Sequence, residues 1–332
     1  MPPLSFSAWM DPADPAALAS FEANAGRLAR VYPDWYRVSA TGTPFRRREA
    51  GAAHRARVLD VARVCPVRIW PMVGNRDAGQ GGFDPALMRL IMGDMATRRA
   101  HIAALRRLVE EDSAQGLDLG YAGLYSSDRD AYSGFVEELC AAFRKTGLGV
   151  GVCVSAEPGD ADGPGSGRAL DAARLAKACD RLHLLGFHGG VEGAFGGTGD
   201  APGPLVPSPR LGAALDRALA LVPAQKLELG LPGAGCAWGP GGPPAPVPWS
   251  VWEGMVREHP PARRDPGSAE LTLRPAQGEV WMGDAISLTA KLWQARLRGV
   301  AQAALLGLGG EDPRVWALLD TLPGDFLGTD RA

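Results

Sequence analysis

Short apolar runs alternate with longer segments of helical periodicity along most of the chain. In residues 130–145, apolar side chains recur every four positions and would form one buried stripe along a helix. The residues of this stripe are Ala131, Phe135, Leu139 and Phe143. Helices are predicted on the same ground at Arg98–Glu111, Asp130–Lys145, Ala169–Ala178, Leu211–Leu221 and Ser287–Leu297.

Eight apolar runs between these segments have the length and composition of buried β-strands. They are Leu4–Trp9, Arg30–Val38, Val67–Val73, Leu117–Leu124, Gly149–Ser155, Arg181–Phe187, Lys226–Pro232 and Gly299–Leu308. Strand and helix in alternation, repeated eight times, indicate a parallel barrel. A doubly wound sheet is the alternative, but no G-x-G-x-x-G turn follows the first strand. We therefore predict an α/β fold, a (β/α)8 TIM barrel, with residues 1–332 as one domain.

One segment departs from the alternation. Glu270–Leu273 and Glu279–Met282 alternate in polarity around a Pro- and Gly-containing turn, which predicts a β-hairpin between strand seven and the last helix. Stretches rich in glycine and proline at 158–167, 189–209 and 239–248 each follow a predicted strand and are expected to be long loops. We expect residues 239–283 to form a loop and hairpin insertion within the barrel domain.

Composition and charge limit the classes of binding partner that the chain is expected to have. The formal charge is −2, so the chain has no strong field to attract nucleic acid or anionic lipid. No apolar run approaches the roughly 20 residues that cross a bilayer. The N-terminus lacks the features of a signal peptide, which leaves open a cytosolic protein or one whose leader is absent from this chain. The five cysteines show no C-x-x-C spacing and are expected to be buried thiols, although one disulfide stays open. No metal or cofactor is predicted.

Five local motifs occur in the order found in one enzyme family. They are Y-P-D-W-Y at 32–36, R-I-W-P-M-V-G-N at 68–75, K-L-E-L-G-L-P at 226–232, E-V-W-M-G-D-A-I-S at 279–287 and L-G-G-E-D-P-R-V-W at 308–316. Together they resemble the bacterial, spore-cortex-lytic branch of the chitinase-like family 18 glycoside hydrolases. The resemblance covers nearly the whole chain and implies a TIM barrel that acts on N-acetylated glycans such as chitin or peptidoglycan.

The family's catalytic signature, D-G-x-D-x-D-x-E, falls on strand four at residues 115–122. The sequence there is Q-G-L-D-L-G-Y-A, so Gln115 replaces the first aspartate and Asp118 is the one retained of the three aspartates. Gly120 replaces the aspartate that orients the substrate's acetamide, and Ala122 replaces the glutamate that protonates the glycosidic oxygen. In the family the acetamide itself attacks the anomeric carbon, an exception to the two-carboxylate scheme. Side chains two apart point the same way along a strand, so residues 118, 120 and 122 are expected to face the barrel interior.

Three further strands lose family residues. The sixth-strand M-x-Y-D is L-G-F-H at 185–188, the seventh-strand tyrosine is Ala234, and the eighth-strand tryptophan is Leu306. Ala122 cannot donate a proton, and loss of a general acid costs about 10²–10⁴-fold in rate. We therefore assign no catalytic residue.

Four residues are candidates for substrate binding: Trp9, Asp118, His188 and Trp238. Trp9 and Trp238 could stack on sugar faces or pack as ordinary aromatics. Asp118 could equally be a buried acid that braces the barrel. His188 could be an acid–base group, a ligand or a polar residue at the start of a loop. Glu157, at the end of strand five, or His188 could supply a relocated acid.

Three functions follow from these observations. The first is a catalytically inactive family 18-like protein that binds an N-acetylated glycan or a protein partner at the barrel mouth. The second is an active glycoside hydrolase with a relocated acid, and the third is a structural scaffold that binds no sugar. The resemblance also favours a secreted or cell-envelope location, by analogy alone.

Overall fold

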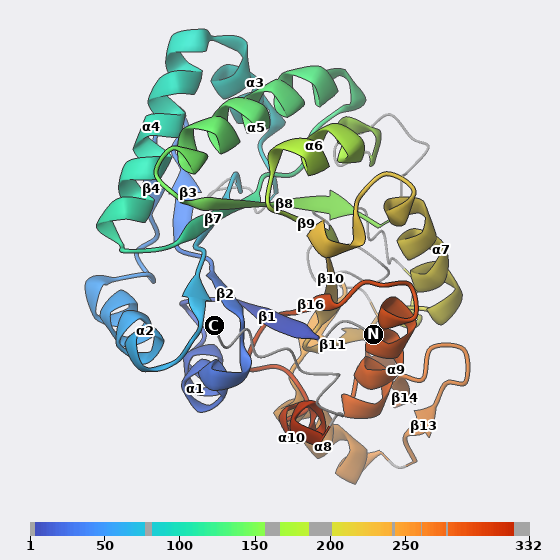
Figure 1. The fold of residues 1–332 in the computed structure, drawn as a ribbon. Helices are drawn as coiled ribbons and strands as arrows, with labels where there is room; N and C mark the ends of the chain where they lie inside the picture. The colour runs from blue at the N-terminus through green and yellow to red at the C-terminus, as the bar shows by residue number, and fades with distance from the viewer. Residues whose placement is uncertain are drawn as a thin grey trace.

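The computed structural model describes residues 4–76, 82–156, 167–185, 201–240, 243–259, 261–276 and 278–321. Within these residues a ring of parallel strands is surrounded by helices, and Figure 1 shows the ring nearly end-on. The strands of the ring are β1 (Ser5–Met10), β2 (Arg30–Pro33), β5 (Arg68–Ile69) with β6 (Met72–Gly74), β7 (Gly116–Gly120), β8 (Gly149–Ser155), β9 (Arg181–Leu185), β10 (Leu227–Pro232) and β16 (Gln302–Leu306).

Closure of the ring depends on the strand that runs from residue 68 to residue 74. Its first half, β5, pairs with β2, and its second half, β6, pairs with β7, both in parallel. Strand β16 joins β10 to β1 on the other side. Strand β3 (Tyr36–Val38) extends the second strand and forms a hairpin with β4 (Pro44–Arg46). The predicted (β/α)8 barrel is confirmed.

The helices follow the strands in the expected order. They are α1 (Pro15–Asn24), α2 (Ala52–Val64), α3 (Pro85–Gly93), α4 (Met95–Glu111), α5 (Arg129–Arg144), α6 (Ala172–Ala178), α7 (Ser208–Leu219), α8 (Trp249–Glu258), α9 (Ala285–Arg296) and α10 (Arg314–Thr321). Their starts have local causes: the Asp84 side chain accepts the Leu87 N–H at 2.9 Å, and the Asp94 side chain accepts the Thr97 N–H at 2.7 Å.

Helix α5 shows where the predicted pattern needs adjustment. Phe135, Leu139 and Phe143 are buried as expected, but Ala131 is exposed and Tyr132 takes its place in the stripe. The difference arises because the buried face of a helix advances by three as well as by four residues.

A second, antiparallel sheet lies beside the barrel. Its strands follow the order β12 (Ala245–Val247), β11 (Gly235–Trp238), β15 (Glu279–Met282), β14 (Leu271–Leu273) and β13 (Arg263–Arg264). Helix α8 packs on this sheet through Trp252, which shares a small core with Leu273, Val280 and Met282. The predicted hairpin is confirmed as β14 and β15, and it is one part of a larger sheet that the alternation alone did not reveal.

Candidate ligand site at the barrel mouth

A cavity of about 380 Å³ opens at the carboxyl ends of the barrel strands. The last residues of β1, β6, β7, β9, β10 and β16 line it, which places it where active sites form in this fold. They are Met10, Gly74, Gly120, Leu185, Pro232 and Leu306.

The wall of this cavity is largely apolar. Trp9, Met72 and Cys153 line it together with Leu185 and Leu306. Trp9 is only 6 % exposed, so the cavity meets just part of its ring. A ligand that enters would therefore contact mainly carbon and sulfur on this side.

Three of the degenerate family positions line this cavity. They are Gly120, at the place of the orienting aspartate, Ala234, at the place of the seventh-strand tyrosine, and Leu306, at the place of the tryptophan. None of these residues offers a carboxylate, a hydroxyl or an aromatic ring to a ligand.

Ala122 lies beyond the end of β7 and is 4 % exposed. The Asn75 amide holds both of its peptide groups, since Asn75 Oδ1 accepts the Ala122 N–H at 3.0 Å and Asn75 Nδ2 donates to the Ala122 carbonyl at 2.9 Å. The preceding Tyr121 reaches the helices, with its hydroxyl 2.7 Å from His101 Nε2. Ala122 is not among the described residues that line the cavity. The prediction that residue 122 faces the barrel interior assumed that the strand continues to residue 122, but β7 ends at Gly120.

Asp118 is fully buried beneath the cavity. Its Oδ2 accepts the Trp9 indole N–H at 2.7 Å, and its Oδ1 lies 3.1 Å from His183 Nε2. The other ring nitrogen of His183, Nδ1, lies 2.7 Å from Glu228 Oε2. Closure of the barrel thus brings together one side chain from each of β7, β9 and β10. They form a buried carboxylate–histidine–carboxylate triad.

Glu228 has further partners at the centre of the barrel. The Tyr32 hydroxyl donates to Oε2 at 2.7 Å and the Ser7 hydroxyl donates to Oε1 at 2.9 Å. His183 and Glu228 have no exposed surface. Neither residue was predicted from the sequence as part of the site, although each is a polar residue at an inward position of an apolar strand.

The triad sets the charge state of the histidine. Burial alone would lower the pKa of His183, but Asp118 and Glu228 outweigh it and raise the pKa to about 9. For Glu228, burial would raise the pKa, and His183 with the other neighbours lowers it to about 2. A protonated His183 with both nitrogens engaged cannot accept a proton from Cys153, whose own pKa is raised by burial and by the two carboxylates. The triad is thus unsuited to activate a thiol nucleophile.

Carboxylates do reach the cavity at its rim. Asp11, Asp14 and Asp34 line it near the ends of β1 and β2. Arg47 lies 3.2 Å from Asp11 and also pairs with Asp34. Arg37 donates to Asp34 Oδ2 at 2.6 Å. Asp14 caps helix α1, its side chain accepting the Ala16 N–H at 2.8 Å.

The predicted candidates are therefore only partly brought together. Trp9 and Asp118 are in contact, one on the cavity wall and one below it. Trp238 lies on β11 in the main hydrophobic core and is not among the described lining residues. His188 and Glu157 fall outside the described residues.

Another degenerate position, Gln115, lies at the other end of the barrel. Gln115 Oε1 accepts the Ile69 N–H at 2.9 Å, and its Nε2 donates to the Ser113 carbonyl at 2.7 Å. The side chain thus joins two strands at their amino ends, far from the mouth.

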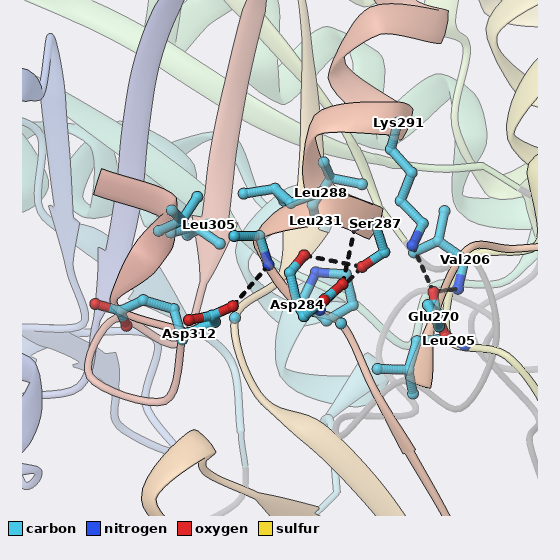
Figure 2. A pocket seen from close by; sticks show the side chains of 16 residues that line it. Leu205, Val206, Leu231, Glu270, Asp284, Ser287, Leu288, Lys291, Leu305 and Asp312 are labelled. Carbon is cyan, nitrogen blue, oxygen red and sulfur yellow. Dashed lines mark hydrogen bonds and ion pairs between the residues drawn. The ribbon is translucent and has the colours of Figure 1, made fainter. Parts of the chain in front are cut away.

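One wall of the cavity is held by a buried ion pair. Glu270 accepts the backbone N–H groups of Leu205 and Val206 at 2.6 and 2.9 Å, and Lys291 Nζ lies 2.7 Å from its Oε1. Leu205 also lines the main cavity. Figure 2 shows these side chains around a second, smaller pocket, which is lined by residues of β10, β16 and α9. The inserted sheet therefore positions part of the barrel mouth.

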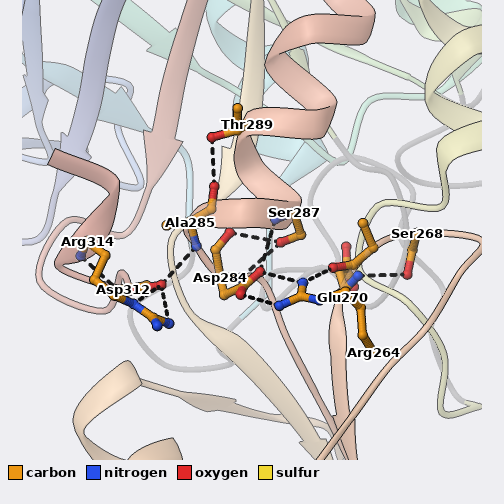
Figure 3. Close-up of polar contacts among 10 residues, drawn as sticks. Arg264, Ser268, Glu270, Asp284, Ala285, Ser287, Thr289, Asp312 and Arg314 are labelled. Carbon is orange, nitrogen blue, oxygen red and sulfur yellow. Dashed lines mark hydrogen bonds and ion pairs between the residues drawn. The ribbon is translucent and has the colours of Figure 1, made fainter. Parts of the chain in front are cut away.

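Neighbouring polar contacts fix the start of α9. Asp284 caps the helix by accepting the Ser287 N–H at 2.9 Å, and Arg264 Nη2 lies 2.7 Å from its Oδ2. Asp312 accepts the Ala285 N–H at 2.9 Å from the far side (Figure 3). These contacts link strand β13, helix α9 and the segment after β16.

Across the part of the chain that the structure describes, no group of three or more histidine, cysteine, aspartate or glutamate side chains could hold a metal ion. Over the same residues, no helix combines the length and apolarity needed to cross a bilayer.

Comparison with known proteins supports this description. No family model matches the chain. The spore cortex-lytic enzyme SleL of Bacillus cereus superposes with a TM-score of 0.85 at 19 % identity, covering 99 % of this chain and 75 % of SleL. A chitinase of Chromobacterium violaceum superposes with a TM-score of 0.81 at 23 % identity, covering 96 % of this chain and 98 % of that one. In sequence, the uncharacterized glycosylase YvbX of Bacillus subtilis is 20 % identical over 266 residues, which are 78 % of this chain and 76 % of YvbX. The chain thus has the barrel fold of the chitinase-like family 18 glycoside hydrolases, and the resemblance in its motifs is confirmed.

Proposed function

We propose that the protein binds an N-acetylated, chitin- or peptidoglycan-like glycan at the barrel mouth without hydrolysing it. The similarity to chitinases and to a spore cortex-lytic enzyme supports this class of ligand. The cavity has the volume of a small-molecule site, and Trp9 offers part of an aromatic face to a sugar ring.

The observation that carries the absence of hydrolysis is the position of Asp118. This one remaining carboxylate of the signature has no exposed surface and is held by Trp9 and His183. Gly120 stands on the cavity wall where the acetamide-orienting carboxylate belongs. A general acid must come within hydrogen-bond reach of the leaving oxygen, and Asp118 does not reach the cavity.

Two assays test the proposal. Retention of the protein on insoluble chitin and peptidoglycan should be lost in Trp9→Leu and kept in Trp293→Leu, which changes a half-exposed tryptophan on the outer helix α9. A chromogenic chitooligosaccharide should show no turnover above the buffer rate. Turnover by the wild type would refute the non-hydrolytic part. If no glycan retains the protein or raises its Tm, while a protein partner binds it tightly, the scaffold function replaces glycan binding.

A second candidate, an active hydrolase with a relocated acid, has one observation in its favour. The Asp11 carboxylate lies at the cavity rim with 55 % of its side chain exposed, directly after β1. If this function is correct, the wild type turns over the chromogenic substrate and Asp11→Asn abolishes that turnover.

A further inference from the structure

The amino end of the barrel, where the strands begin, contains buried donors for which the described part of the chain supplies no acceptor. Arg30 is the first residue of β2 and is 9 % exposed. It shares the inward face of β2 with Tyr32, which bonds to Glu228. Its Nε and Nη1 atoms are buried, and neither has a hydrogen-bond partner among the described residues. Buried polar groups are nearly always paired with protein, water or an ion, so this arginine requires an explanation.

A second arginine shows the same feature on the opposite side of the ring. Arg181 is the first residue of β9, two positions before the inward-facing His183. Its Nη1 donates to the carbonyls of Asp180 and Gln225, at 2.9 and 3.3 Å. Its Nε is buried and has no hydrogen-bond partner within the described part of the chain.

Trp70 brings a further donor to this end of the barrel. Its ring lies against Gly116 and Gly149, where an added Cβ would come within 2.5 and 2.3 Å of it. The Arg30 guanidinium stacks over the ring, with Cζ 5.2 Å from the ring centroid. The Trp70 indole N–H is also buried without an acceptor among the residues described. The two guanidiniums also interact electrostatically: after burial, repulsion by Arg30 is the next cause that lowers the pKa of Arg181.

The charged side chains inside the barrel also indicate an excess of positive charge at this end. Arg30, Arg181 and the protonated His183 are three cations, and they face the two carboxylates of Asp118 and Glu228. Counting only the side chains that the structure describes, one positive charge is therefore not balanced by an interior carboxylate. The Asp180 side chain, which is exposed, offsets Arg181 only from outside the ring. Buried water could accept hydrogen bonds from the orphan donors, but it would not neutralise the charge.

We propose that the amino end of the barrel binds a small inorganic anion between Arg30 and Arg181. The anion accepts hydrogen bonds from the guanidinium nitrogens and the Trp70 indole, and it neutralises the excess positive charge. This site lies at the end of the barrel opposite the glycan cavity and does not depend on the proposed function. In TIM barrels the amino end serves stability, so bound anion is expected to stabilise the fold rather than to take part in chemistry.

The test compares anions at constant ionic strength. Tm is measured in sodium gluconate, whose anion is too large for a buried site, as it is replaced stepwise by sodium chloride, sodium bromide or sodium phosphate. The wild type should show a saturable rise of about 2 °C with at least one small anion. A crystal soaked in bromide should show an anomalous peak between the guanidiniums if halide is the ligand. A response to phosphate alone assigns the site to the larger anion.

Variants separate anion binding from a structural role. Arg30→Gln should abolish the saturable rise, and it should be no less stable than the wild type in gluconate, because it removes an unbalanced buried charge. Arg48→Gln, which changes an arginine with a 96 % exposed side chain, is the matched control and should keep the wild-type response. If Arg30→Gln fails to fold, Arg181→Gln and the bromide peak in the wild type decide the matter. The proposal is overturned if no small anion gives a saturable rise, or if Arg30→Gln responds as the wild type does.

Discussion

The buried triad is expected to make the barrel less stable as the pH rises from neutral to alkaline. The pKa of His183 is about 9 in the folded protein, against an ordinary value of 6.5 in the unfolded chain. Between these values the folded state holds a proton that the unfolded state has lost. The stabilisation is therefore fully present below pH 6.5 and is lost as the pH rises through 9. At about 1.4 kcal/mol per unit of pKa difference, the whole effect is about 3 kcal/mol, of which about 2 kcal/mol is lost between pH 6.5 and 8.5.

Urea denaturation at half-unit steps over this pH range measures the effect. The wild type should lose about 2 kcal/mol of unfolding free energy, with nearly constant slope in urea. His183→Gln should be less stable at pH 6.5, because it leaves two buried carboxylates without their cation, and its stability should change little up to pH 8.5. His259→Gln, which removes an exposed histidine after α8, is the control and should follow the wild type.

Two results would refute this reasoning. One is a wild-type unfolding free energy that stays flat between pH 6.5 and 8.5. The other is a ring signal of His183, followed by NMR in the wild type, that titrates below pH 7. The NMR measurement needs no variant, so it stands even if His183→Gln does not fold.

Three further predictions concern other parts of the fold. Burial lowers the pKa of His101 to about 4 in the folded protein, so the folded state favours the neutral ring. The stabilisation from this shift is present above pH 6.5, and about 3 kcal/mol of unfolding free energy is lost as the pH falls to 4. Urea denaturation of the wild type and of His101→Gln over this pH range checks the prediction. Lys291→Met should cost about 3–5 kcal/mol, because it leaves the buried Glu270 carboxylate without its cation, and Glu270→Gln added to it should recover part of that loss in the same assay. Gly309→Ala should cost about 2 kcal/mol or more, since φ is +94° and a Cβ would come within 2.5 Å of the α1 backbone, whereas Gly26→Ala, with no atom within 4 Å, should be nearly neutral. An equal effect of the two glycine changes would contradict the last prediction.

The barrel was predictable because its local patterns agree with its global fold. Each of the eight apolar runs overlaps a strand of the ring, and Gly149–Ser155 has the predicted bounds. The ends of strands are predicted less well where pairing with a neighbouring strand stops early. Leu117–Leu124 was predicted as one strand, but β7 ends at Gly120. Pairing with β6 ends at the same residue, and no sequence pattern along a single strand reveals where its neighbour stops.

The centre of the site was harder to predict, for a different reason. His183 and Glu228 do interrupt apolar strands, which is a usable signal because a buried charge needs a partner. The identity of those partners was not available, since Asp118, His183 and Glu228 are at least 45 residues apart in sequence and meet only when the ring closes. The rim carboxylate Asp11 carries a weaker signal, a polar residue directly after a strand end.

These contacts determine what we expect when the two missing carboxylates of the signature are introduced by mutation. The double variant Gly120→Asp with Ala122→Glu rebuilds the last two carboxylates of the signature. A Cβ at Gly120 would lie 3.0 Å from Met72 Sδ and 3.3 Å from the Val73 carbonyl, so an aspartate there has to displace Met72.

The second position presents a larger obstacle. Ala122 is buried, and Asn75 fixes both of its peptide groups. Ala122 is not among the described residues that line the cavity, and Asp118 below it stays bound to Trp9 and His183. We expect the double variant to bind glycan no better than the wild type and to show no turnover of a chromogenic chitooligosaccharide. Turnover would mean that the barrel mouth needs only these two carboxylates, and that the buried triad places no constraint on the chemistry above it.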